Sequence, residues 1–289
     1  MARGLRWERE ARTWPHAETS RFVRAGGIEW HVQVMGPDGA PEALLLHGAG
    51  AAGMSWRRLA PRLAGRFRAI VPDLPGHGFT GRPFAAPTSL PLVAERLGAL
   101  LSVLGARPAL VVGHSAGAAV LARMALDGRI APEAFVAVNG ALTPFRGVAA
   151  LALPGMARLL SFNPLAPAAI ATAAIDPNAV PLLLRSTGSR IDREGEALYG
   201  RLFRNMGHVA GVVAMMAAWD LSALARDLPR LRPAPLLLAG SLDRAVPPAE
   251  AEEVAARIPG ARALILPGLG HLAHEEDAAR VLEAILGAP

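Results

Sequence analysis

The sequence contains no cysteine and no lysine, and the first absence limits its chemistry directly. Without cysteine the chain has no disulfide bond, no thiolate metal site and no cysteine nucleophile. All 30 cationic residues are arginine, a bias that codon usage in a GC-rich genome would explain. The net charge of +6 does not predict nucleic-acid binding, because the arginines are scattered. The densest group is interpreted as the solvated face of one helix: Arg57, Arg58, Arg62, Arg66 and Arg68.

The sequence also lacks a long apolar segment. Residues 1–20 are charged throughout, unlike a secretory signal. The longest uncharged run, residues 159–175, contains Pro164 and Pro167 and is too short and broken to span a bilayer. We therefore expect a cytoplasmic protein. Peripheral contact with a membrane through the apolar residues 147–175 stays open as an alternative to burial.

Short apolar runs alternate with helix-forming segments at both ends of the chain. This pattern predicts the α/β class, with a mostly parallel eight-stranded sheet and helices on both faces. The predicted strands, of which the first two form an antiparallel hairpin, are residues 21–25, 28–34, 43–46, 68–71, 109–112, 134–138, 236–239 and 263–266. Core helices are expected over residues 55–64, 89–104, 116–127, 248–257 and 277–286.

The alternation stops in the middle of the chain. From about Thr143 to Trp219 there are only Leu, Ala and Met segments, interrupted by Pro and Gly. We predict a helical cap over residues 143–220, inserted between core parts 1–142 and 221–289. Its helices are expected at residues 147–160, 177–186, 192–206 and 208–219. Most of their apolar surface should be internal packing, and some should face an apolar ligand.

The strongest motif is Gly-His-Ser-Ala-Gly at residues 113–117, which lies between a buried strand and a helix-forming run. A turn this sharp leaves no room for a Cβ at the positions of Gly113 and Gly117. Ser115 is then held in a strained conformation, with its hydroxyl exposed above the start of a helix. This context predicts that Ser115 is a nucleophile.

A serine nucleophile needs a base, and the base needs a group that orients it. Asp243 follows the penultimate predicted strand and His271 follows the last, in the chain order that this fold requires. The rival acid position, after residues 134–138, holds Asn139, which is not a carboxylate. His274 is interpreted as a helix-start or surface residue. We therefore predict a Ser115–His271–Asp243 triad.

Stabilisation of an oxyanion requires two backbone N–H groups, for which Ala116 and Ala49 are the candidates. Ala116 follows the nucleophile, and Ala49 lies in the glycine-rich loop after residues 43–46. His47, His114 and Trp219 are the candidates for substrate contact. Bracing of the loop by His47 and packing or orientation by His114 remain as alternatives. Because these histidines and His77 lack metal-ligand spacing, we expect no metal, and no cofactor either.

These landmarks resemble the α/β-hydrolase superfamily from Phe22 to Leu286. Within it, the chain looks closest to the magnesium-chelatase accessory proteins of bacteriochlorophyll biosynthesis. The resemblance to the superfamily rests on His47-Gly48, residues 73–78 and 113–117, Asp243 and Gly270-His271. The resemblance to the subgroup rests on residues 20–27, 30–34, 75–80, 138–141, 187–190, 207–211 and 267–276. The second resemblance implies a role near magnesium insertion into protoporphyrin.

Two kinds of function stay open. One is a serine hydrolase of an apolar ester or thioester, which acts either in that pathway or as a general carboxylesterase. Epoxide hydrolases and haloalkane dehalogenases are disfavoured, because they need an aspartate where Ser115 stands. The other is a non-catalytic accessory protein that binds a porphyrin or the chelatase subunits. In that case cap arginines could pair with propionates, unless they simply form a solvated face: Arg185, Arg190, Arg193, Arg201 and Arg204.

Overall fold

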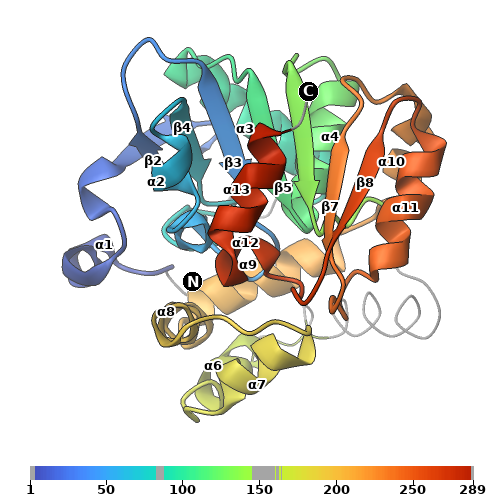
Figure 1. Cartoon of the computed structure of the whole chain (residues 1–289). Helices are drawn as coiled ribbons and strands as arrows, with labels where there is room; N and C mark the ends of the chain where they lie inside the picture. The colour runs from blue at the N-terminus through green and yellow to red at the C-terminus, as the bar shows by residue number, and fades with distance from the viewer. Residues whose placement is uncertain (1–3, 83–87, 145–159, 161–162, 164, 288–289) are drawn as a thin grey trace.

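The computed structural model describes residues 4–82, 88–144, 160, 163 and 165–287. Within these residues eight strands form one sheet in the order β1-β2-β4-β3-β5-β6-β7-β8 (Figure 1). Strand β2 pairs antiparallel with β1 and β4, and the other pairs are parallel, which confirms the predicted fold class. The strands are β1 (Ser20–Ala25), β2 (Ile28–Met35), β3 (Glu42–Leu46), β4 (Arg68–Pro72), β5 (Leu110–His114), β6 (Ala134–Val138), β7 (Leu236–Gly240) and β8 (Arg262–Leu266).

Helices cover both faces of the sheet, and the central strands are buried on both sides. In β3, Leu44 and Leu46 enter one apolar core, whereas Ala43 and Leu45 enter the other, as the two-residue period of a strand requires. The first core is completed by α3 (Leu90–Leu104), α4 (Ala116–Leu126), α10 (Ser222–Asp227) and α11 (Pro248–Arg257). The second is completed by α2 (Ala60–Leu63), α12 (Ala273–Glu276) and α13 (Ala278–Leu286).

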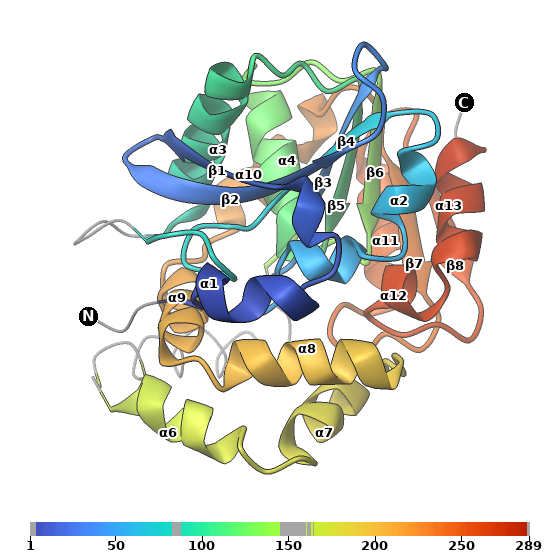
Figure 2. The same ribbon diagram turned by 90° about the vertical axis from the view of Figure 1, so that its left-hand side faces the viewer.

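Four described helices lie between β6 and β7: α6 (Ala166–Ala173), α7 (Ala179–Ser186), α8 (Arg193–Phe203) and α9 (Met206–Ala217). They gather at one end of the molecule, with α6 and α7 furthest from the sheet (Figure 2). Side chains of Asp192 and Asn205 cap α8 and α9 by accepting from main-chain N–H groups. Three of the four predicted cap helices are therefore present, and α6 was not predicted. The fourth prediction, residues 147–160, lies almost wholly outside the described residues, as does most of the predicted membrane-contact segment.

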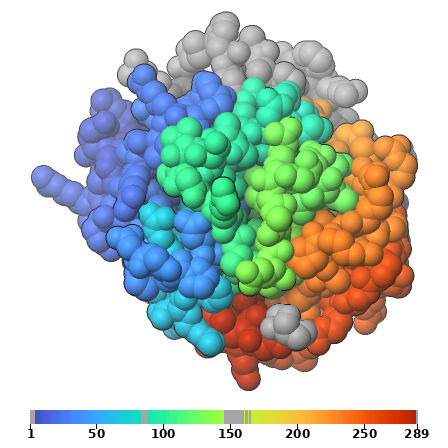
Figure 3. All heavy atoms as spheres, turned by 90° about the horizontal axis from the view of Figure 1, so that it is seen from above, coloured from blue at the N-terminus to red at the C-terminus, as the bar shows by residue number. Residues whose placement is uncertain are grey.

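The two core parts of the chain, before and after the cap, form one body. Seen from the end opposite the cap, N-terminal segments and C-terminal segments lie side by side (Figure 3). No single described helix is long and apolar enough to cross a membrane. One pair, Met206–Ala217 with Ser222–Arg230, passes that test only together and is bent by 55°.

The prediction of one helix over residues 55–64 is wrong. The chain forms a 3₁₀ turn at Gly53–Trp56 and a separate short helix α2, in which Pro61 occupies the first turn. Proline cannot donate the hydrogen bond that a continuous helix would need there. The solvated arginine face fails with it, because Arg57 is 6% exposed and Arg68 begins β4. The short α1 (Trp7–Glu10) was also not predicted, since its sequence has no apolar periodicity.

Candidate active site

Ser115 lies in the sharp turn between β5 and α4 and has the strained backbone angles φ 50° and ψ −119°. A Cβ on Gly113 would lie 2.5 Å from the Ala118 Cα, and one on Gly117 would lie 2.2 Å from the Leu46 carbonyl oxygen. Both positions therefore require glycine, as the motif predicts. A Cβ on Gly48 would lie 2.9 Å from the Ser115 Cβ, so the loop after β3 lies directly against the serine.

Asp243 and His271 meet at the same edge of the sheet, beyond the ends of β7 and β8. The His271 Nδ1–H donates to Asp243 Oδ2 at 2.8 Å, and the two side chains are 12% and 0% exposed. The other carboxylate oxygen, Oδ1, accepts from the main-chain N–H groups of Ala245 and Val246 at 2.8 and 2.9 Å. The carboxylate is thus held from both sides, in the arrangement that orients a histidine base.

Asn139 supports the acid, a role that sequence reasoning missed. It follows β6 directly, has φ 48°, is 1% exposed, and donates from Nδ2 to Asp243 Oδ2 at 2.7 Å. The same amide lies 3.3 Å from the Gly270 carbonyl oxygen, next to His271. Asn139, at the rival acid position, therefore holds the Asp243 carboxylate in place. The sequence feature that could have indicated this role is the position of Asn139 directly after β6, at the same edge of the sheet as Asp243.

His114 connects the serine turn to the histidine loop. Its Nε2–H donates to the main-chain carbonyl of His271 at 2.9 Å, and the two ring centroids lie 4.7 Å apart. The His114 ring is only 2% exposed, so it orients the loop rather than lining an open surface. Since Ser115 follows directly in the chain, this contact links the turn that holds Ser115 to the loop that holds His271.

A model of the alpha/beta hydrolase family matches residues 43–284, which include all of these positions. The chain belongs to the alpha/beta hydrolase family. Structures with the same fold include an alpha/beta hydrolase fold protein from Burkholderia ambifaria (TM-score 0.78, 22% identity, 93% of this chain and 97% of that one). The epoxide hydrolase CorEH has TM-score 0.77 and 22% identity over 93% of this chain and 97% of its own.

One relative is similar over almost the whole chain. The magnesium-chelatase 30 kDa subunit of Rhodobacter capsulatus is 40% identical over 262 residues, which cover 91% of each chain. A lipase of Mycobacterium tuberculosis, LipV, is 42% identical over 98 residues, which cover only 34% of this chain and 36% of its own. The similarity to the chelatase subunit therefore extends over the helices between β6 and β7 as well as the strands of the sheet.

His47 and Trp219, the remaining candidates for substrate contact, differ in their surroundings. His47 is fully buried, donates from Nδ1 to Gly48 O and accepts the Leu74 N–H at Nε2, both at 2.8 Å. This leaves no polar atom of the ring for a substrate and favours the bracing role. Trp219 follows α9, is partly buried and packs against the core cluster of α3 and α4. Its contact with substrate stays a prediction.

Ala49 and Ala116 lie on the two sides of Ser115. Ala116 is the first residue of α4, where N–H groups have no acceptor within the helix. Among the described residues, neither the Ala49 nor the Ala116 N–H has a hydrogen-bond acceptor. Their role as the two donors of an oxyanion hole stays a prediction.

A buried network of charges joins the cap to the loop after His271. Glu275, in α12, is 1% exposed and pairs with Arg57, which also binds Asp192 at the start of α8. Glu275 Oε1 accepts from the Tyr199 hydroxyl at 2.8 Å and the Ser55 hydroxyl at 3.0 Å. Burial raises the pKa of the Glu275 carboxyl in spite of these partners.

His274 belongs to the same network, so the surface interpretation is wrong, although it does lie at the start of α12. Its side chain is fully buried and its Nε2–H donates to Ser55 Oγ at 2.6 Å. Its ring lies 4.5 Å from that of His114. Among the described residues, no group of three or more His, Asp or Glu side chains is arranged to hold a metal ion.

Five buried histidines are held in the neutral state, which makes stability depend on pH. Burial lowers the pKa of His208 to about 4 and of His274 to about 3, and it also lowers those of His47, His77 and His114. The unfolded chain binds protons from about pH 6.5 downward, whereas the folded chain does not until lower pH. Folding stability should therefore be complete above pH 6.5 and fall as the pH approaches 4.

His208 offers a direct measurement of this effect. It accepts the Gly78 N–H at Nδ1 (3.1 Å), an acceptor that a glutamine can replace. Between pH 7.5 and 5.0 the free energy of unfolding in urea should fall, and His208→Gln should reduce that fall by about 2 kcal/mol. An unchanged pH dependence in the variant would show that His208 does not contribute.

Proposed function

We propose that the protein is a serine hydrolase in which Ser115 is the nucleophile, His271 the base and Asp243 the group that orients the base. The observation that carries this proposal is the Asp243 carboxylate, which is hydrogen-bonded at both oxygens and binds His271 Nδ1. Ser115 lies in a strained turn directly after His114, which bonds to the His271 carbonyl oxygen. That arrangement leaves His271 Nε2 unprotonated and able to accept the serine proton.

The reaction would proceed by two acyl transfers. His271 Nε2 takes the Ser115 proton as Oγ attacks the carbonyl carbon, and the N–H groups of Ala49 and Ala116 bind the resulting oxyanion. The tetrahedral intermediate then expels the alcohol or thiol, which receives the proton from His271. Water, activated by the same nitrogen, hydrolyses the acyl-serine and regenerates Ser115. Asp243 stabilises the imidazolium in both halves.

An apolar side chain beside the proposed oxyanion loop favours an apolar acyl group. The ring of Phe203, in α8, would lie 3.3 Å from a Cβ on Gly50, next to the proposed oxyanion loop. Apolar walls with a few polar groups are typical of pockets for small hydrophobic ligands. We therefore propose an ester or thioester of an apolar acid as the substrate, and Trp219 as a further contact.

We further propose that this activity belongs to bacteriochlorophyll biosynthesis, at or near the insertion of magnesium into protoporphyrin. The support is the 40% identity to the magnesium-chelatase 30 kDa subunit over 91% of both chains. Association with chelatase subunits is part of the same proposal.

We place the protein in the cytoplasm at the photosynthetic membrane, with the cap as the contact. Three cap residues, Leu165, Ile175 and Leu182, are 71, 65 and 67% exposed. Flotation with liposomes tests this contact: protein left at the bottom of the gradient would contradict it.

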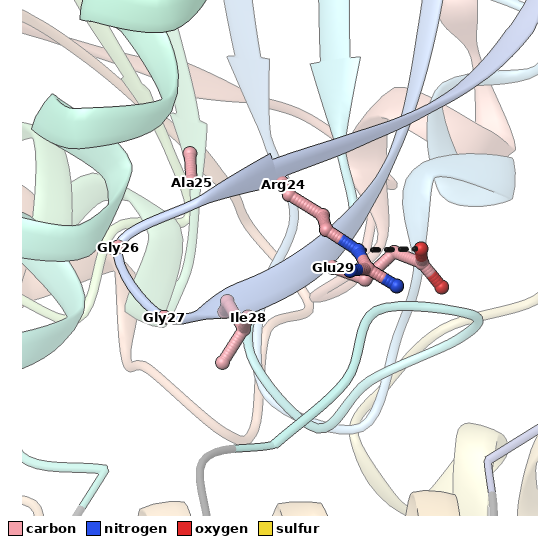
Figure 4. A pocket seen from close by; sticks show the side chains of 6 residues that line it. All are labelled: Arg24, Ala25, Gly26, Gly27, Ile28 and Glu29. Carbon is pink, nitrogen blue, oxygen red and sulfur yellow. Dashed lines mark ion pairs between the residues drawn. The ribbon is translucent and has the colours of Figure 1, made fainter.

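A non-catalytic accessory role is the second candidate, and the cap arginines favour it. Arg185, Arg193 and Arg204 have no carboxylate partner among the described residues, so they could pair with the propionates of a porphyrin. Arg201 is less available, because it pairs with Glu10. A hollow of about 580 Å³ lies elsewhere, at the β1–β2 turn. Its lining residues, drawn in Figure 4, include no residue of the proposed triad. Its exposed pair Arg24–Glu29 offers little for specific binding.

Two experiments separate the candidates. A hydrolase should turn over p-nitrophenyl esters, with rates that rise with acyl length and vanish after reaction with a fluorophosphonate. In Rhodobacter capsulatus cells without their 30 kDa subunit, the wild-type chain should support pigment formation and Ser115→Ala should not. Normal pigment with Ser115→Ala would overturn the hydrolase proposal and favour the binding role.

A further inference from the structure

A short cap segment, residues 187–189 between α7 and α8, presses against the loop that carries Asp243. Gly188 has φ 87°, and a Cβ there would lie 1.9 Å from the Leu242 carbonyl oxygen. The Thr187 carbonyl oxygen accepts the Arg244 N–H at 3.0 Å. The segment therefore contacts the chain immediately before and immediately after Asp243.

The same segment also contacts the loop that carries His271. Ser189 Oγ accepts the Leu272 N–H at 2.9 Å. A Cβ on Gly270 would lie 2.3 Å from the Gly188 carbonyl oxygen, so the two backbones are in direct contact. Residues on both sides of His271 are thus held by the cap, and the only side-chain bond among these contacts comes from Ser189.

The Ser189 hydroxyl is part of a continuous hydrogen-bond chain. The Leu272 N–H donates to Ser189, Ser189 donates to Thr187 Oγ1 at 2.9 Å, and Thr187 donates to the Leu184 carbonyl oxygen at 2.7 Å. Ser189 is fully buried, so water cannot take the place of a partner that its hydroxyl loses. Because Leu184 is in α7, the chain runs from the last turn of a cap helix to the residue after His271.

We propose that Ser189 is a positioning residue, through which the cap holds the His271 loop in the geometry that the reaction needs. The cap is then part of the catalytic construction rather than only a cover over it. Displacement of α7 by a ligand or a partner would move the His271 loop through three hydrogen bonds. The expected effect of Ser189 on the reaction rate rests on the proposed function, whereas the hydrogen-bonded link between α7 and the His271 loop does not.

Ser189→Ala and Thr187→Val test the link, because each removes one hydroxyl from the chain with little change in volume. Hydrogen exchange of the Leu272 amide, measured against the core amide of Val112, should become at least about 10-fold faster in both variants. Saturable reaction of Ser115 with a fluorophosphonate should lose about 10- to 100-fold in maximal rate, with an unchanged half-saturating concentration. Thr187→Ser keeps the hydroxyl and should restore both values.

Ser186→Ala is the matched control, since among the described residues that exposed hydroxyl bonds only to Leu183 O within α7. Unchanged Leu272 exchange in both test variants would overturn the proposal. So would an unchanged maximal rate of phosphonylation in Ser189→Ala. If the wild-type protein does not react with the phosphonate, the hydrolase function has failed, and the exchange measurement alone decides whether the cap holds the loop.

Discussion

Replacing Asp243 by asparagine is expected to slow the reaction of Ser115 with a fluorophosphonate about 10⁴-fold. All four partners of the carboxylate are N–H donors: Ala245, Val246, Asn139 and His271. The two main-chain donors are fixed, so the asparagine oxygen must face them and its NH₂ group must face His271 Nδ1. Nδ1 then accepts a hydrogen bond, the proton moves to Nε2, and the base can no longer take the serine proton.

Asp38→Asn is the control for this substitution. The Asp38 side chain is 98% exposed, so the same chemical change there should leave the rate unaltered. Folding of the Asp243 variant can be verified by its unfolding transition in urea. A rate within 10-fold of wild type for Asp243→Asn would contradict the role of Asp243 as the group that sets the His271 tautomer.

Replacing Arg57 by alanine is expected to lower the free energy of unfolding by about 3 to 5 kcal/mol. The Arg57 side chain is 3% exposed, and its main partner Glu275 is 0% exposed. Removing the cation leaves a carboxylate inside the protein without its counter-charge, next to the start of α8. Urea unfolding at pH 7.5 measures the loss, and the double variant with Glu275→Gln should recover part of it.

Arg58→Ala provides a comparison within the same network. Arg58 also pairs with Asp192, but its side chain is 44% exposed, and exposed ion pairs contribute about 1 kcal/mol or less. The two arginines are adjacent in sequence and equal in charge, but only Arg57 is buried and only Arg57 pairs with Glu275. Similar losses from the two substitutions would contradict the account of Arg57 as a buried link between cap and core.

The strands and the three main site residues could be predicted from the sequence because their signals are local. An apolar run such as residues 43–46 fits a strand buried on both faces, and glycines at 113 and 117 indicate a turn with no space for a Cβ. Asp243 and His271 could be placed because strand ends converge at one edge of a parallel sheet. Each inference needed only a short segment and the fold class.

The residues that support the site could not be predicted, because their roles depend on contacts across the chain. Asn139 meets Asp243 over 104 positions, and Ser189 meets Leu272 over 83. The burial of Arg57 depends on Glu275, 218 positions away. The residues next to Arg57 in the sequence do not show that it pairs with a distant buried carboxylate. The sequence therefore predicted, wrongly, that Arg57 lies on a solvated helix face.

Mass spectrometry of the protein after reaction with a fluorophosphonate tests the central claim most directly. The account predicts one phosphonyl group per folded chain, located on the peptide that contains Ser115, and no label on unfolded protein. Folded protein that stays unlabelled, or that carries its label on another serine, would contradict the assignment of Ser115 as an activated nucleophile.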